Sequence, residues 1–249
     1  MDIYKEKYFY VIVMLRVYIM KYVKSFILGV LVLYISTSHA FANYSNGVIA
    51  MMIGQSDYAV SEFKKAAAEG HVEATYSLGY MYENAVGIAK DYCEALKWYK
   101  MAAAMGDAKS QYILGNMYNR GRGVEKNDAI AVSWYKLAAE QDYAWAQYFL
   151  GLKLERGEGI EKNLNQSSVW YARAAEKEHA GAQYNLAQMY YQGHGVDQNY
   201  IEAYKWASLA DAYAHSEAEA LMKRLEEKLD NEAIMTNRTI IKKWIRQHR

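Results

Sequence analysis

The feature that most constrains this chain is a single spacing of 36 residues shared by four ladders of identical side chains. The ladders are Leu78, Leu114, Leu150 and Leu186; Trp98, Trp134, Trp170 and Trp206; Tyr76, Tyr112, Tyr148 and Tyr184; and Gly87, Gly123, Gly159 and Gly195. A fixed period of this size, kept in register by unrelated residue types, indicates stacked copies of one supersecondary unit.

Each period is predicted to form two helices. In the stretch SQYILGNMYNRGRGVEKNDAIAVSWYKLAAEQDYAW, Gly121 and Gly123 end the first helix, because glycine adopts the left-handed conformation without a steric penalty. Asn127 is a good N-cap for the second helix, and its equivalents are Asp91, Asn163 and Asn199. Where Ala85 replaces the loop glycine, Asn84 is expected to supply the left-handed residue. The second helix then places Ala131, Trp134, Tyr135, Ala138 and Ala139 on one face.

The consensus A-x-x-x-L-G-x-M-Y-x-x-G-x-G-V-x-K-[DN]-x-x-x-A-x-x-W-Y-x-x-A-A resembles the Sel1-like repeat, a relative of the tetratricopeptide repeat with a longer loop. The resemblance covers roughly residues 43–249 and implies an all-α, right-handed α-solenoid. The complete absence of proline suits a nearly all-helical chain. Repeats of this kind serve many partners, so the fold does not name the function.

The first 42 residues differ in composition from the rest. Lys21 and Lys24 precede an apolar run over 26–35, and Ala40-Phe-Ala42 follows, which is the pattern of a signal peptide cleaved after Ala42. Met20 is an alternative start for translation. The competing interpretation is an uncleaved membrane anchor over 8–35, which would favour a membrane-anchored structural scaffold.

The remaining chain is divided into a shortened first repeat over 43–70, four full repeats over 71–214 and a helical cap over 215–249. The four full repeats cover 71–106, 107–142, 143–178 and 179–214. Asp57 is the expected cap of the second helix in the shortened repeat. In the tail, Thr236 is the expected cap of a last helix with Ile240, Ile241, Trp244 and Ile245 on one face. The ends of a solenoid need such a covering element.

Few residues suggest catalysis or cofactor binding. Ser61/Lys64 and Ser133/Lys136 match the S-x-x-K pattern of penicillin-recognising serine enzymes, but no K-T-G or S-D-N accompanies them. The six histidines have no metal-ligand spacing, so neither a metal site nor a cofactor is expected. An envelope enzyme, such as a β-lactam or peptidoglycan hydrolase, remains an alternative function.

Charge and cysteine content limit the kinds of partner and covalent link that we expect for this chain. The net charge of +1 gives no nucleic-acid footprint. Lys242, Lys243, Arg246 and Arg249 suit a helix C-terminus, where cations are favourable. Cys93 is the only cysteine, which excludes an intramolecular disulfide. We expect a monomer that contacts a membrane only through its N-terminal segment, if that segment is not cleaved.

The resemblance implies that the first helices of the repeats line a concave groove, where a peptide or protein partner binds. The candidate groove residues are Tyr76, Tyr80, Lys109, Tyr112, Asn116, Asn119, Trp145, Tyr148, Leu152, Tyr184, Gln188 and Tyr191. Aromatic side chains beside amides offer stiff area with polar tips. Part of the tyrosine ladder also fits the core packing of the repeat, so both interpretations stay open. The predicted function is non-catalytic protein binding at the bacterial envelope or outside the cell.

Overall fold

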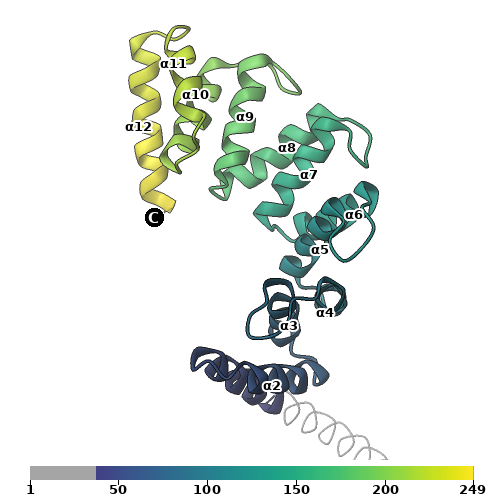
Figure 1. Cartoon of the computed structure of the whole chain (residues 1–249). Helices are drawn as coiled ribbons and strands as arrows, with labels where there is room; N and C mark the ends of the chain where they lie inside the picture. Colours follow the sequence, from purple (N-terminus) through teal and green to yellow (C-terminus); the bar gives the residue numbers. More distant parts are fainter. Residues whose placement is uncertain (1–37, 249) are drawn as a thin grey trace, which may run out of the picture. The chain divides into compact units, whose positions relative to one another are not determined.

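The computed structural model describes residues 38–248, in which every regular element is a helix (Figure 1). The chain divides into two compact units, one that ends at Lys90 and one that begins at Asp91. The predicted leader lies almost entirely outside the described residues. No helix in the part of the chain that the structure describes is long and apolar enough to cross a membrane.

The first unit contains a helix over 38–52 followed by α2 (Ser56–Ala68) and α3 (Val72–Asn84). Phe63 of α2 is fully buried and lies so close to Gly47 that a Cβ there would meet its ring at 2.5 Å. Two local predictions are wrong here. Gln55 precedes α2 and makes no side-chain cap bond, so Asp57 lies inside the first turn instead of capping it. Ala85 itself adopts the left-handed conformation that was assigned to Asn84.

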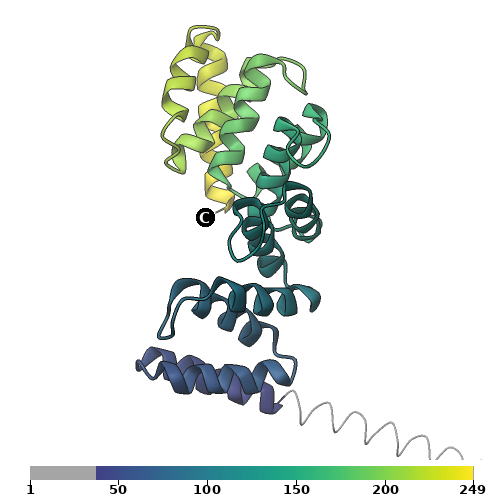
Figure 2. The same cartoon turned by 45° about the vertical axis from the view of Figure 1, so that its right-hand side comes forward.

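The second unit is a row of helices in which each one packs against the next along the chain, except that the last two both pack against the third from the end (Figure 2). Its elements are α4 (Tyr92–Ala104), α5 (Ala108–Arg120), α6 (Asp128–Glu140), α7 (Ala144–Arg156), α8 (Leu164–Glu176), α9 (Ala180–Gln192), α10 (Tyr200–Ala212), α11 (Ala218–Glu226) and α12 (Asn231–His248). The odd-numbered helices from α5 to α9 are the first helices of their repeats, and the even-numbered helices from α4 to α10 are the second. The all-α solenoid predicted from the repeats is confirmed.

The predicted caps explain where the second helices begin. Asp91, Asn127, Asn163 and Asn199 each accept a hydrogen bond from a backbone N–H in the first turn of α4, α6, α8 and α10. These bonds satisfy donors that no helical carbonyl reaches. The first helices α5, α7 and α9 end on Gly121, Gly157 and Gly193, all of which are left-handed.

The core of the second unit is built from tyrosines and alanines of the second helices. Tyr99, Tyr135 and Tyr171 are fully buried, whereas Trp98, Trp134 and Trp170 of the tryptophan ladder are only partly buried. The Tyr135 and Tyr171 rings lie against first-helix glycines, and a Cβ on Gly115 or Gly151 would approach them to 2.4 and 2.7 Å. In the last full repeat the glycine is replaced by Ala187 and the tyrosine by Ala207. The smaller second-helix side chain therefore makes room for the extra methyl group.

A buried ion cluster replaces apolar packing at one point of the array. Lys153 of α7 is 5% exposed and lies 2.7 Å from carboxylate oxygens of Asp128 and of Glu158. Its ammonium group holds the pKa of both carboxyls below their usual range. The equivalent positions hold Met81, Met117 and Met189, all buried. The charge is tolerated because the two acids compensate for its loss of water.

The tail forms α11 and α12, which pack against α10. Leu221 and Leu225 lie one helical turn apart on α11, and both are buried. The predicted start of the last helix is wrong, because α12 begins five residues before Thr236, where Asp230 accepts a hydrogen bond from the Ala233 amide. The predicted helix face of Ile240 is also wrong. Ile241 is buried and Trp244 and Ile245 are partly so, but Ile240 is 48% exposed on another face.

Candidate partner-binding surface

The candidate residues of the second unit come from the same helical positions of α5, α7 and α9. Lys109 and Trp145 lie in the first turn of their helices. The tyrosine ladder occupies the next position along the same face, and amides or Leu152 occupy the turns that follow. Because residues three and four apart share one helix face, the repeat brings these side chains to one side of the row. Trp145 is the most exposed large apolar side chain among the candidates, at 51%.

Trp145 belongs to a cluster of aromatic side chains. Its ring centroid is 4.4 Å from that of His179, edge to face, and 6.5 Å from that of Tyr112. Tyr148 stacks on the His179 ring with a centroid distance of 4.4 Å. The Tyr112 ring is also 5.7 Å from Phe149. These contacts hold the aromatic groups in fixed positions while half of the Trp145 side chain stays in contact with water.

The tyrosine ladder has a packing role that accounts for its periodicity. Tyr148 of α7 stacks on His179, and Tyr184 of α9 stacks on His215 at 4.3 Å, so each tyrosine contacts a ring that lies before the next odd-numbered helix, α9 or α11. The same contact joins Tyr44 and His71 within the first unit. The Nδ1 atoms of His71 and His179 also accept hydrogen bonds from the first turns of α3 and α9. Tyr148 and Tyr184 therefore help to join consecutive repeats, as the packing interpretation expects.

Several polar candidates bind tyrosine hydroxyls. Tyr135 donates to Asn116 Oδ1 at 2.9 Å, and Tyr171 donates to Glu155 Oε2 at 2.6 Å. Gln188 Nε2 donates to the Tyr184 hydroxyl at 2.8 Å. Burial raises the pKa of Tyr135 and of Tyr171, so both hydroxyls stay protonated and donate. Asn116 is consequently tied to the core of its own repeat.

The other candidates differ in accessibility. Lys109 is exposed and Asn119 half-buried, while Leu152 packs against the buried cluster of the later repeats. Tyr191 contacts Tyr200 with a centroid distance of 5.7 Å. In the first unit, Tyr76 and Tyr80 stack at 6.4 Å, and Tyr80 is 44% exposed. The structure thus places the second-unit candidates on equivalent helix positions, with very different freedom to meet a partner.

Sequence reasoning missed the part that His179 and His215 play. Their signal was present, since four of the five residues at this repeat position are rings, His71, Tyr143, His179 and His215, and only Asp107 is not. Burial lowers the pKa of His179 to about 4, and the positive charge of nearby His215 acts in the same direction. A neutral imidazole keeps Nδ1 available as the acceptor at the start of α9.

Both members of one candidate catalytic pair, Ser133 and Lys136, are bonded to other residues. The Ser133 hydroxyl donates to the Ile130 carbonyl at 2.7 Å, and Lys136 is paired with Glu140. Within residues 38–248 no three His, Cys, Asp or Glu side chains are grouped so that they could hold a metal ion. Cys93 is a free, exposed thiol.

Comparison with known proteins agrees with this geometry. The Sel1 repeat family model matches residues 72–107, 108–143, 146–179 and 180–210. A Sel1 repeat protein from Oxalobacter formigenes is 31% identical over 72% of this chain and 74% of its own, with a TM-score of 0.68. A protective antigen of uropathogenic Escherichia coli strains, which displays an SLR fold, is 28% identical over 84% of this chain, with a TM-score of 0.73.

The chain spans less than half, 46%, of that antigen's length. No curated protein matches the sequence. Proteins built from Sel1 repeats are generally protein-interaction modules, and the family is typically a non-enzymatic scaffold. The four matched repeats cover more than half of the sequence, and the chain belongs to the Sel1 repeat family.

Proposed function

We propose that this protein is a non-catalytic binding module that takes a peptide segment of a protein partner along the first helices of its repeats. The observation that carries the proposal is Trp145, an exposed indole held in place by Tyr112 and His179. Tryptophan and tyrosine dominate the residues on which protein complexes depend most, because they bury large area at little cost in conformational entropy.

The surroundings of Trp145 suit a peptide. Asn119 of α5 and Gln188 of α9 offer amide groups, and an amide can both donate to and accept from a peptide backbone. Tyr148 and Tyr184 give the surface its shape, since they are fixed by their histidine stacks. We therefore assign the strongest contact with the partner to Trp145, with Lys109, Asn119 and Tyr191 as further contacts. Tyr76 and Tyr80 are the corresponding candidates in the first unit.

We also propose that the chain is exported, with its leader removed after Ala42, and acts in the periplasm or outside the cell. The support is the order of basic, apolar and small residues before Asn43. A chain that begins at Asn43 keeps Tyr44 and Gly47, which pack against His71 and Phe63. Retention of the leader would instead make the protein a membrane-anchored scaffold.

The test is an affinity pull-down from envelope extract with the mature chain and two triple variants. Asn119→Ala, Trp145→Ala and Tyr191→Ala together remove candidate contacts from three first helices. Asn116 is left intact because it holds the Tyr135 hydroxyl. The matched control is Ile130→Ala, Leu137→Ala and Val169→Ala, at exposed apolar positions of second helices.

The first triple variant is expected to lose the partner, since losing one good aromatic contact costs about 2 kcal/mol or more of binding free energy. Its helical signal and melting midpoint are expected to stay close to wild type. The control variant is expected to keep the partner. A partner retained by the first variant and lost by the control would place binding on the second helices. Turnover of a substrate that disappears after a single Ser, His or acid substitution would replace the proposal with the enzyme alternative.

A further inference from the structure

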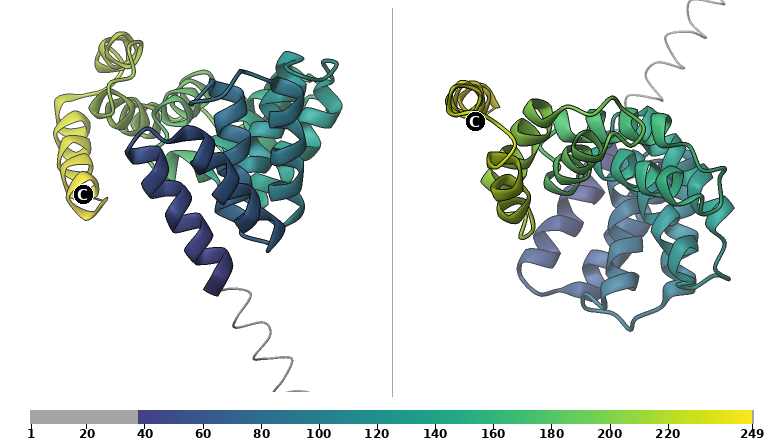
Figure 3. Two further views of the ribbon diagram at one scale, coloured as in Figure 1. Left: turned by 60° about the horizontal axis from the view of Figure 1, so that its bottom comes forward. Right: turned by 90° about the horizontal axis from the view of Figure 1, so that it is seen from above.

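The last helix, α12, presents an outward face that no other helix of the second unit covers (Figure 3). Its inward face holds Ile234, Asn237 and Ile241, all buried. The outward stripe follows the helical spacing i, i+4, i+7 and i+11, with Glu232, Thr236, Thr239 and Lys243, all exposed. Met235 and Ile240 flank this stripe, at 63% and 48% exposure.

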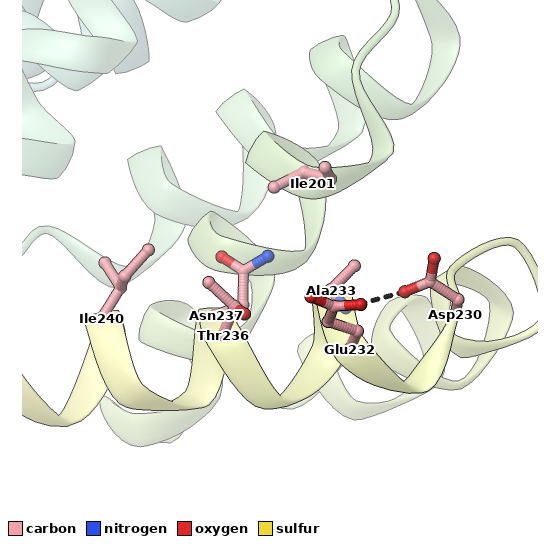
Figure 4. A pocket seen from close by; sticks show the side chains of 7 residues that line it. All are labelled: Ile201, Asp230, Glu232, Ala233, Thr236, Asn237 and Ile240. Atoms are coloured by element: carbon pink, nitrogen blue, oxygen red, sulfur yellow. Dashed lines mark hydrogen bonds between the residues drawn. The ribbon is translucent and has the colours of Figure 1, made fainter.

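One edge of this stripe borders a hollow between α12 and the start of α10. The hollow measures about 300 Å³. Figure 4 shows Ile240, Thr236 and Ala233 along α12, with Ile201 of α10 facing them across the opening and Asn237 between. Ile201 and Ile240 are each about half exposed. An apolar group that entered the hollow would cover both isoleucines.

The outward face of α12 carries negative charge at its beginning and positive charge near its end. Asp230 and Glu232 lie at its beginning, and Lys242, Lys243 and Arg246 lie near its end. Neither Glu232 nor Lys243 has an ion-pair partner among the described residues. The helix dipole favours this order of charges, but it gives no reason for Met235 and Ile240 to face outward between them.

The pattern is complementary to itself in the antiparallel sense. Suppose that two copies of α12 cross midway between Asn237 and Arg238. Glu232 of each copy then lies opposite Lys243 of the other, because both residues are equally far from the crossing point. Thr236 lies opposite Thr239 in the same way. Ile240 of each copy comes opposite Ala233 and Thr236 of the other, which line the hollow.

We propose that the protein forms a homodimer through antiparallel pairing of α12, with Ile240 of each copy in the hollow of the other and two Glu232–Lys243 ion pairs. Such an interface is isologous, so its two halves are identical and it closes without further copies. The acids on the same face disfavour a nucleic acid or an anionic membrane as the occupant. This proposal departs from the monomer that the sequence alone led us to expect.

The size of the contact sets the expected strength. A single helix pair with two flanking apolar groups falls at the small end of specific interfaces, which belongs to weak or transient assemblies. The dimer is therefore expected at micromolar concentrations and above, with dissociation on dilution. High salt is expected to weaken it, because exposed ion pairs are screened.

The test uses sedimentation velocity over a concentration series with two single variants, Glu232→Lys and Lys243→Glu. Either change places like charges opposite each other twice in the homodimer, and self-association is expected to weaken by about tenfold or more. An equimolar mixture of the two variants restores both attractive pairs. The mixture is therefore expected to form a heterodimer about as tightly as the wild type self-associates.

Lys162→Glu, at an exposed position in the loop after α7, controls for the change in net charge made by Lys243→Glu and is expected to dimerise normally. Ile240→Asp is expected to abolish the dimer by putting a charge into the hollow. Far-UV circular dichroism checks that each chain is folded. The proposal is overturned by a wild type that stays monomeric at the highest concentration. It is also overturned by single variants that dimerise like the wild type, or by a mixture that associates no better than its components.

Discussion

His179 makes the stability of the array depend on pH in a defined window. Its pKa in the folded chain is about 4, against an ordinary value of 6.5, mainly because the ring is buried. Between these values the unfolded chain binds a proton that the folded chain does not. The stability from this group is therefore complete above about pH 6.5 and is lost as the pH falls towards 4, by about 3 kcal/mol in total.

The matched variant is His179→Asn, which keeps a cap acceptor for the Ala182 amide but does not titrate. Urea unfolding of both chains between about pH 7 and pH 4 should show that the wild type loses more stability than the variant, by up to about 3 kcal/mol. Carboxylates with lowered pKa, such as Asp128, contribute equally to both chains and cancel in the difference. NMR titration of the ring gives the pKa directly. A His179 that titrates near 6.5, or equal losses in the two chains, would refute this reasoning.

Three further predictions follow from packing and processing. N-terminal sequencing of the exported protein should find Asn43 first; an intact leader in a membrane fraction would favour the anchored alternative. Gly151→Ala should destabilise the chain by about 1–2 kcal/mol in urea unfolding, because overpacking against Tyr171 outweighs the better helix propensity. The reverse change at the equivalent position, Ala187→Gly, should cost no more than about 1 kcal/mol. Tyr171→Ala should cost about 3–5 kcal/mol, and Trp170→Ala clearly less because Trp170 is only partly buried; equal costs would contradict the burial pattern.

The fold was predictable because each local sequence signal, such as a helix cap, recurs at the same position in several repeats. Asn127 and its equivalents were assigned as caps from residue type and spacing alone, and all four cap their helices. Gly115 and Gly151, each of which follows a ladder leucine, allow the close approach of the second-helix tyrosines. Where a signal occurred only once, as at Asp57 and Thr236, the prediction failed because side-chain type does not distinguish a cap from a first-turn or interior residue.

The candidate surface was less predictable, because a residue's helix position does not say what its tip contacts. Asn116 and Asn119 looked equivalent, yet Asn116 accepts the Tyr135 hydroxyl. Lys153 stands where other repeats have methionine, and only the fold brings Asp128 and Glu158 to it. Ile240 was assigned to the inward face from an apolar run that in fact continues around the helix. Each of these depends on contacts between segments far apart in the sequence.

The most direct test of the central claim is photo-crosslinking in envelope extract from benzoylphenylalanine placed at Trp145 or at Val169. Both positions are about half exposed, one on a first helix and the other on a second helix. The proposed function predicts that one protein is crosslinked from Trp145 and not from Val169, and that an excess of unlabelled mature chain competes for it. Crosslinks to the same protein from Val169 alone, or equally from both positions, would contradict binding along the first helices.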